Sequence, residues 1–302
     1  MQILEDLDPY NIFLGYRRHH MKHHIGIMQG RLTEPKGRGI QFFPFENWEK
    51  EFYDAKEIGL DEIEFIFDYP NYEKNPLWQK AGLTKIQKII NETGVCVRSI
   101  CFDYFIRRPF YKKEGHDLEL LKKENTHIIK QVISAMDLLG ISLIEIPLVD
   151  NSSLKNDYEK LHFKNWLNEI VLSSPKNINF SLETDLPPEK FLAYIQDIGL
   201  ENVGANYDSG NSSGIGYDLY QEVTTLGSYI FNIHIKDRVY RGGTVKLGNG
   251  SADFDRLFRG LKEINYKNSF ILQAARGTDG NEKNNIVSQM LFTNHYIKKY
   301  DL

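Results

Sequence analysis

The chain has 302 residues, of which 41% are hydrophobic and 26% are charged, and its formal net charge is −4. This composition is sufficient for a sizeable core, and α/β barrels of this length commonly form a single domain. The slightly acidic balance lacks the basic stripe that binds nucleic-acid backbones, so we expect no nucleic-acid partner. No apolar run approaches the length of a membrane span, so we expect no membrane partner.

The first residues differ from the rest of the chain. Residues 1–23 contain neither the apolar segment nor the cleavage site of a signal peptide, and strand-like periodicity begins only at His24. We therefore divide the chain into an N-terminal extension, residues 1–23, and one domain, residues 24–302. The two cysteines, Cys96 and Cys101, lie five residues apart in one predicted strand, with side chains on opposite faces. Their spacing excludes a mutual disulfide and a metal motif, which favours a cytoplasmic protein.

Short apolar runs alternate with longer amphipathic stretches along the remaining chain. The apolar runs predict strands at His24–Gln29, Glu62–Phe67, Val95–Phe102, Ser142–Leu148, Asn177–Glu183, Val203–Tyr207, Ile230–Ile235 and Ser269–Leu272. The longer stretches predict helices at Trp48–Ile58, Leu83–Glu92, Leu118–Leu139, Tyr158–Leu172, Glu189–Ile198, Tyr217–Thr225, Asp253–Ile264 and Lys283–Tyr300. Several of these helices are followed by a glycine, which commonly ends a helix.

Eight strand–helix units in one chain predict a (β/α)8 TIM barrel. The run ISLIEIPLV, residues 141–149, is largely apolar on both faces, as expected of a parallel strand covered by helices. A doubly wound open sheet is the alternative, but no G-x-G-x-x-G motif follows the first strand. In a TIM barrel the functional residues gather at the carboxyl ends of the strands.

Four successive strands end in residues that bear on a metal site. Glu183, Asp208 and His234 lie at the ends of the fifth, sixth and seventh predicted strands. Two carboxylates and an imidazole are typical ligands of a divalent cation that acts on an oxygen-rich substrate. The last strand leads to Gln273, whose amide can coordinate through its carbonyl but cannot accept a proton near neutral pH.

Five segments in the second half of the chain resemble motifs of the xylose isomerase-like TIM barrels, the sugar phosphate isomerase/epimerase superfamily. They are SLETD, YDSGN, NIHIKDR, LGNGSADF and ILQAARG, in that order. The resemblance implies one divalent ion, Mn, Mg, Co or Zn, whose ligands are Glu183, Asp208, His234 and Gln273. Two positions depart from the family pattern, because Gln273 replaces a glutamate and Asn211 replaces a histidine that meets the substrate.

The resemblance also implies an isomerase or epimerase that acts on a sugar or sugar derivative through an enediolate, with Glu183 as base. In the ketose epimerases of this family two glutamates transfer protons on opposite faces of the substrate, and Gln273 removes one of them. A single base favours isomerisation, unless Glu64, Asp103 or Glu145 supplies the second one. Two other functions stay open: a metal-assisted dehydratase of the inosose dehydratase type, and a non-catalytic carbohydrate-binding barrel with a degraded metal site.

Further polar residues near the strand ends are candidates for binding the sugar. They are Arg31, Glu64, Glu145, Asn211, Lys236, Arg238 and Arg276. Buried carboxylates such as Glu64 and Glu145 are otherwise unfavourable inside apolar strands, and cations at the barrel mouth can hold a phosphate or a carboxylate. Lys236 either polarises a substrate carbonyl or only pairs with Asp237. Because dimers and tetramers are common in the resembled family, the resemblance also implies a homo-oligomer.

Overall fold

The computed structural model describes residues 23–302, which form a closed barrel of parallel strands. The barrel strands are β1 (Ile25–Met28), β2 (Glu62–Ile66), β3 (Ser99–Cys101), β4 (Leu143–Leu148), β5 (Asn179–Thr184), β6 (Val203–Asp208), β7 (Ile230–Ile235) and β10 (Phe270–Leu272). Around the barrel their order is β1-β10-β7-β6-β5-β4-β3-β2. The predicted TIM barrel is therefore confirmed. Residues 1–22, which make up nearly all of the predicted extension, lie outside the described residues.

The strands are buried almost throughout because helices cover their outer faces. The barrel closes where β1 pairs with β10, with Ile27 opposite Leu272. Most strands begin and end within two residues of the predicted positions. The exception is β3, which pairs regularly only over Ser99–Cys101, while Cys96 forms an isolated bridge with Glu62.

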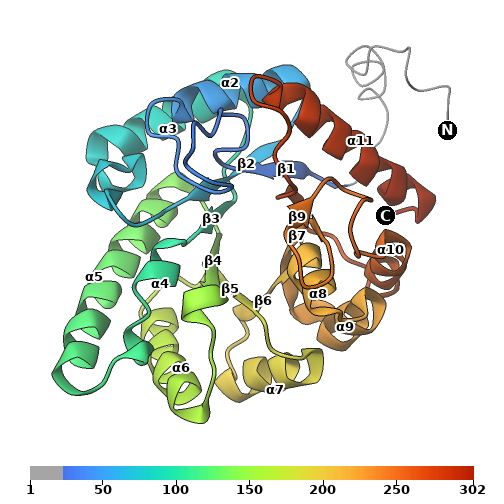
Figure 1. Ribbon diagram of the computed structural model, residues 1–302. Coiled ribbons are helices and arrows are strands. Elements are labelled where there is room, and N and C mark those ends of the chain that lie inside the picture. The colour runs from blue at the N-terminus through green and yellow to red at the C-terminus, as the bar shows by residue number, and fades with distance from the viewer. Residues whose placement is uncertain (1–22) are drawn as a thin grey trace, which may run out of the picture.

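A ring of helices surrounds the strands, with the last helix beside the first (Figure 1). These helices are α2 (Trp48–Ile58), α3 (Lys80–Thr93), α5 (Gly115–Leu139), α6 (Asp157–Leu172), α7 (Pro188–Ile198), α9 (Leu219–Leu226), α10 (Phe254–Glu263) and α11 (Glu282–Lys299). The predicted glycine stops hold, because Gly59, Gly94, Gly140 and Gly199 adopt left-handed conformations at the ends of four helices. None of the described helices is long and apolar enough to cross a membrane.

Short elements that the sequence pattern did not predict lie in the loops between strands and helices. They are α4 (Tyr104–Arg107), α8 (Ser209–Ile215), the hairpin of β8 (Asp237–Arg238) and β9 (Thr244–Val245), and the 3-10 helices η1 (Tyr72–Lys74), η2 (Pro76–Trp78), η3 (Phe110–Lys112), η4 (Asp150–Ser152) and η5 (Gly227–Tyr229). Most of them follow the carboxyl ends of strands and so surround the mouth of the barrel. The single helix predicted at Tyr217–Thr225 is preceded by α8, and α9 begins two residues later than predicted.

The interior of the barrel is polar, whereas TIM-barrel interiors are usually filled by branched apolar side chains. Glu64 of β2 accepts hydrogen bonds from Ser99 of β3 (2.6 Å) and Asn232 of β7 (2.8 Å). Because β2 and β7 are not neighbours in the barrel, these side chains meet across its interior. Buried polar groups of this kind are stable only when they are paired, so the network fixes the side chains of several strands at once.

Candidate active site

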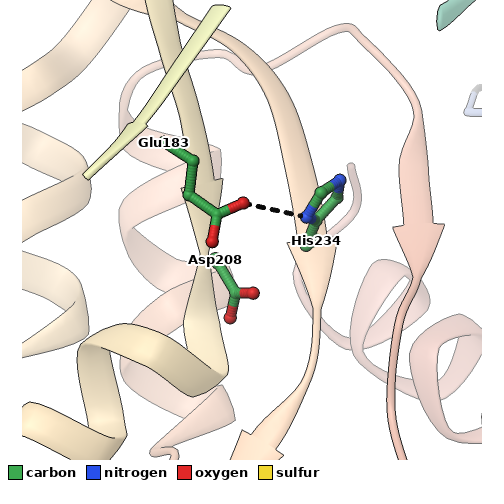
Figure 2. Close-up of side chains that lie close together, drawn as sticks. All are labelled: Glu183, Asp208 and His234. Carbon is green, nitrogen blue, oxygen red and sulfur yellow. Dashed lines mark ion pairs between the residues drawn. The ribbon is translucent and has the colours of Figure 1, made fainter. Parts of the chain in front are cut away.

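Three predicted ligands lie together where β5, β6 and β7 end. One donor atom each from Glu183, Asp208 and His234 can be chosen so that all lie within 4.8 Å of one another. Figure 2 shows the carboxylate of Glu183 facing the imidazole of His234, with His234 Nδ1 3.5 Å from Glu183 Oε2, and Asp208 beside Glu183. All three are buried, so solvent screens their charges weakly.

The imidazole of His234 is oriented from behind by Glu64. His234 Nε2 lies 2.6 Å from Glu64 Oε1, and an ionised carboxylate can only accept, so the proton of this bond belongs to Nε2. Nδ1 is then the ring nitrogen that faces Glu183. The Asn206 amide donates to Glu183 Oε2 at 3.0 Å, and its nitrogen lies 3.1 Å from Nδ1. A carboxylate behind an imidazole is the usual support of a metal-ligating histidine.

The electrostatics of this pair follow from burial and charge. Burial opposes ionisation of Glu64, but the charge and hydrogen bond of His234 outweigh it and hold the pKa of Glu64 below its ordinary value. Burial likewise acts to lower the pKa of His234, yet Glu64 and Glu183 raise it well above the ordinary value. The site therefore favours a positive charge at its centre. Its donor set, two carboxylates and one imidazole nitrogen, fits a divalent ion such as Mn²⁺, Mg²⁺, Co²⁺ or Zn²⁺.

Asp208 is fixed by the helix that begins after it. Its Oδ1 accepts hydrogen bonds at 2.8 Å from the backbone N–H groups of Gly210 and Asn211, which caps α8. Its Oδ2 lies 3.1 Å from Lys236 Nζ. Gly210 is required here because an added Cβ would come within 2.5 Å of the Lys236 side chain.

Lys236 does not pair with Asp237, which was one of its two predicted roles. Asp237 instead accepts hydrogen bonds from backbone N–H groups of the glycine-rich loop, from Gly248 (2.9 Å), Gly250 (2.8 Å) and Ala252 (3.0 Å). The LGNGSADF segment thus holds a buried carboxylate through its backbone. Lys236 remains directed at the candidate site.

Gln273 and Asn211, the two departures from the family pattern, both contact the site. Asn211 donates to Glu183 Oε1 and accepts from Arg238 Nη1 at 3.2 Å. Gln273 accepts from Lys236 Nζ at 3.3 Å and donates from Nε2 to Gln41 Oε1 at 3.0 Å. The amide of Gln273 is therefore oriented by its neighbours, with its oxygen toward the lysine.

These residues border a cavity of about 730 Å³ at the mouth of the barrel. Its lining includes the sequence-predicted residues Glu145, Glu183, Asn211, Lys236, Arg238 and Gln273. Gln41 and Asp103 also line it. Gln41 and Asn206 were missed as site residues: Gln41 lies in an irregular loop whose path cannot be read from spacing, but Asn206, two residues before Asp208, shares its face by strand alternation.

Three predicted substrate contacts have other partners and do not line the cavity. Glu64 lies behind His234 and contacts its Nε2. Arg31 is buried and donates to the backbone oxygens of Ile40 and Gln273. Arg276 donates to the backbone oxygens of Gly30 (2.8 Å), Thr33 (2.9 Å) and Ile40 (2.9 Å). Both arginines were predicted from their distance along the chain to strand ends, and that distance does not tell which way a guanidinium turns.

Comparison with protein families finds a match over most of the chain. The model of the xylose isomerase-like TIM barrel matches residues 52–294. The chain belongs to this family. The resemblance drawn from five short motifs is thereby confirmed, and the matched range begins in α2 and ends in α11.

Curated relatives of the chain are sugar epimerases by name. L-ribulose-5-phosphate 3-epimerase UlaE of Salmonella heidelberg (strain SL476) is 26% identical over 239 residues, which cover 76% of this chain and 82% of that protein. The putative L-ribulose-5-phosphate 3-epimerase SgbU of Haemophilus influenzae is 24% identical over 267 residues, covering 83% and 88%. The prediction of an enzyme of the sugar isomerase and epimerase kind is confirmed by these relatives.

Solved structures show the same fold. An L-ribulose 3-epimerase superposes with a TM-score of 0.71 at 15% identity, covering 92% of this chain and 96% of the other. The IOLI protein with a bound zinc atom superposes with a TM-score of 0.69 at 16% identity, covering 92% and 99%.

Proposed function

We propose that this protein is a divalent-metal-dependent 3-epimerase of a ketose or ketose phosphate. The observation that carries the proposal is the buried group of Glu183, Asp208 and His234, of which Glu183 lines a cavity large enough for a sugar. Gln273 by itself favoured isomerisation, but the two curated relatives are 3-epimerases by name, so we place epimerisation first.

Glu183, Asp208, His234 and, as a neutral fourth ligand, Gln273 would hold a divalent ion, which would supply positive charge to stabilise negative charge on substrate oxygen. The chain's own residues do the remaining work. Glu183 removes the proton from the carbon next to the substrate carbonyl, because its carboxylate lies at the cavity wall. Asn211 donates to Glu183 Oε1 and thereby orients the carboxylate toward the cavity. Lys236 places an ammonium group beside the same space.

The cavity contains cationic groups suited to a phosphorylated ketose. Arg107 lies at the mouth, with its side chain 59% exposed and its Nε 3.7 Å from Asp68. A guanidinium in this position can rotate to bind a phosphate through paired N–H groups. We therefore place L-ribulose 5-phosphate, the substrate named in the relatives, ahead of the free sugar.

Metal titration combined with proton exchange tests the proposal. The protein is treated with a chelator and titrated with Mn²⁺ by calorimetry, and L-ribulose 5-phosphate is then incubated with the loaded protein in D₂O. We expect one Mn²⁺ site, deuterium at C3 by NMR, and formation of the C3 epimer. Loss of water from the sugar would instead indicate a dehydratase.

Matched aspartate variants provide the control. Asp208→Asn should lower Mn²⁺ affinity at least tenfold, because a charged ligand becomes neutral. Asp54→Asn should leave it unchanged, since Asp54 is similarly buried but pairs with Lys50 and Lys283. A wild-type protein that binds none of Mn²⁺, Co²⁺ and Zn²⁺ would refute the proposed function.

A further inference from the structure

Epimerisation needs a second group that returns a proton on the face opposite Glu183, and an amide at position 273 cannot do so. Glu64, Glu145 and Asp103 are three carboxyls close to the candidate site. Glu64 is engaged with Ser99, Asn232 and His234. Glu145 also lines the cavity, but it is fully buried and pairs in register with Cys101 and Ser181, two residues deeper in the barrel than Asp103 and Glu183. Asp103 lies just beyond β3, 8% exposed and at the cavity wall. Two other acids of the lining face cations instead, Asp68 with Arg107 at 3.7 Å and Asp185 with Lys155 at 2.9 Å.

The carboxyl of Asp103 is held in place by two donors. Gln41 Nε2 donates to Asp103 Oδ2 at 2.6 Å, and Cys101 Sγ lies 3.3 Å from Oδ1. These contacts fix the group at the cavity wall without neutralising it by an ion pair. Burial raises the pKa of Asp103, which favours the protonated form that a proton donor requires.

The same hydrogen bonds explain why position 273 holds an amide. Gln273 donates to Gln41 Oε1, which turns the Gln41 N–H toward Asp103. Lys236 Nζ donates to Gln273 Oε1 at 3.3 Å, so the amide nitrogen of Gln273 is the atom that faces Gln41. An ionised glutamate at 273 has no N–H and could not make the bond to Gln41 Oε1. Gln273 thus orients the carboxylate of another strand.

The two carboxyls lie on different walls of the barrel. Glu183, Asp208 and His234 come from the neighbouring strands β5, β6 and β7. The chain from Gln273 through Gln41 to Asp103 lies on the other arc, formed by β10, β1, β2 and β3. A ketose in the cavity between the arcs presents one face to Glu183 and the other to Asp103.

We propose that Asp103, positioned by Gln41 and Gln273, is the second proton-transfer residue, an inference that rests on the proposed function. Glu183 takes the C3 proton of one epimer, the C–H electron pair passes into the enediolate, and the Asp103 carboxylic acid protonates C3 from the other face. Glu183 ends protonated and Asp103 ionised, and exchange with water restores both. The reverse reaction begins with proton removal by Asp103.

The test follows C3 exchange in D₂O for each epimer separately, L-ribulose 5-phosphate and its C3 epimer, with the Mn²⁺-loaded full chain. Wild type should exchange and interconvert both. Asp103→Asn should reduce interconversion at least about 100-fold, the usual effect of losing a positioned acid or base. It should also stop exchange from one epimer while leaving exchange from the other, whose C3–H faces Glu183, within about threefold. A merely structural defect would slow both exchanges equally.

If Asp103→Asn interconverts the epimers like wild type, or loses both exchanges in parallel while its unfolding transition is unchanged, Asp103 is not the second group. If wild type exchanges neither epimer, the proposed function fails and this assignment fails with it. Should Asp103→Asn not fold, Gln41→Met removes the orienting amide at a partly exposed position and must give the same one-sided loss in weaker form. Asp54→Asn serves as the matched control.

Discussion

At the residue scale, the site depends on side chains that do not touch the substrate. Glu64 fixes both the ring orientation of His234 and the position of its proton through the contact at Nε2. The amide nitrogen of Asn206 contacts both Glu183 Oε2 and His234 Nδ1. Metal ligands that are oriented in this way bind more tightly, because little freedom is lost when the ion enters.

Glu64→Gln tests this support. The amide keeps the size of the carboxylate but removes its charge. His234 therefore loses the charged partner that makes Nδ1 a stronger metal ligand. We expect Mn²⁺ affinity in calorimetric titration to fall about 10-fold to 100-fold. Glu62→Gln is the matched control, because Glu62 is also a buried glutamate of β2 but pairs with Arg98. Equal losses in the two variants would show that charge in the barrel, and not the contact with His234, determines affinity.

The sequence predicts part of this site and not the rest, for a physical reason. Strand-end positions follow from hydrophobic periodicity, so the spacing of the strands is enough to place Glu183, Asp208 and His234 together. The contact between Gln41 and Gln273 depends on the path of an irregular loop, which periodicity does not specify. The orientation of Arg276 depends on the same loop, so its contacts with the loop's backbone oxygens could not be predicted from the sequence.

At the element scale, that loop between β1 and α2 is held from two sides. Glu51 of α2 accepts hydrogen bonds from the backbone N–H of Gly30 and Leu32, at 2.9 and 3.2 Å, and from the hydroxyl of Thr33 at 2.8 Å. Arg276, beyond β10, binds three of the loop's carbonyl oxygens. The loop carries Gln41, so the elements around it also position the amide next to Asp103.

Arg276→Met should therefore act on stability. Its loss leaves backbone carbonyls with fewer partners, and we expect the free energy of unfolding in urea to fall by about 1–3 kcal/mol. Arg107→Met, at an exposed position of the cavity mouth, should change it by less than about 0.5 kcal/mol. An Arg276→Met protein with wild-type stability and an impaired KM would restore the original interpretation of Arg276 as a substrate contact.

Helix α8 illustrates how tertiary contacts override local propensity. Its sequence, SGNSSGI, is poor in helix-forming residues, and the sequence pattern therefore predicted no helix there. Asp208 caps its first turn. Gly210 lies against Lys236 and Gly214 against Arg238, so the glycines let two cavity residues pass close to the helix. These close approaches involve residues distant in sequence, which periodicity cannot reveal.

At the scale of the whole molecule, the alternation of strands and helices sufficed to predict the barrel, because each element has a hydrophobic period that the fold preserves. The polar interior was predicted only as isolated glutamates.

Burial of these and other acids has a consequence for stability. It raises the pKa of Glu51, Glu62, Asp68 and Glu222 to about 7 in each case. An acid whose pKa is higher in the folded state destabilises that state once the unfolded chain ionises.

Glu222 of α9 allows this effect to be isolated, since it is buried and Tyr207 donates to its Oε2 at 3.2 Å. Its stabilising contribution is complete below pH 4.5, the ordinary pKa, and is lost as the pH rises through about 7. Glu222→Gln cannot ionise, so the variant should gain up to about 3 kcal/mol relative to wild type between pH 4.5 and pH 8. Urea unfolding at several pH values measures this difference.

Asp218, the N-cap of the same helix, provides a control of opposite sign. Burial acts to raise its pKa, but hydrogen bonds from the backbone N–H of Gln221 and from Arg256 hold it below the ordinary value. Its contribution is present above the ordinary pKa of 3.8 and is lost as the pH falls through the lower folded-state pKa. The free energy of unfolding of Asp218→Asn should therefore be closest to that of wild type at acidic pH. The gain in this free energy for Glu222→Gln should be largest at basic pH. Parallel pH profiles for the two variants would mean that buried acids do not set the pH dependence of this barrel's stability.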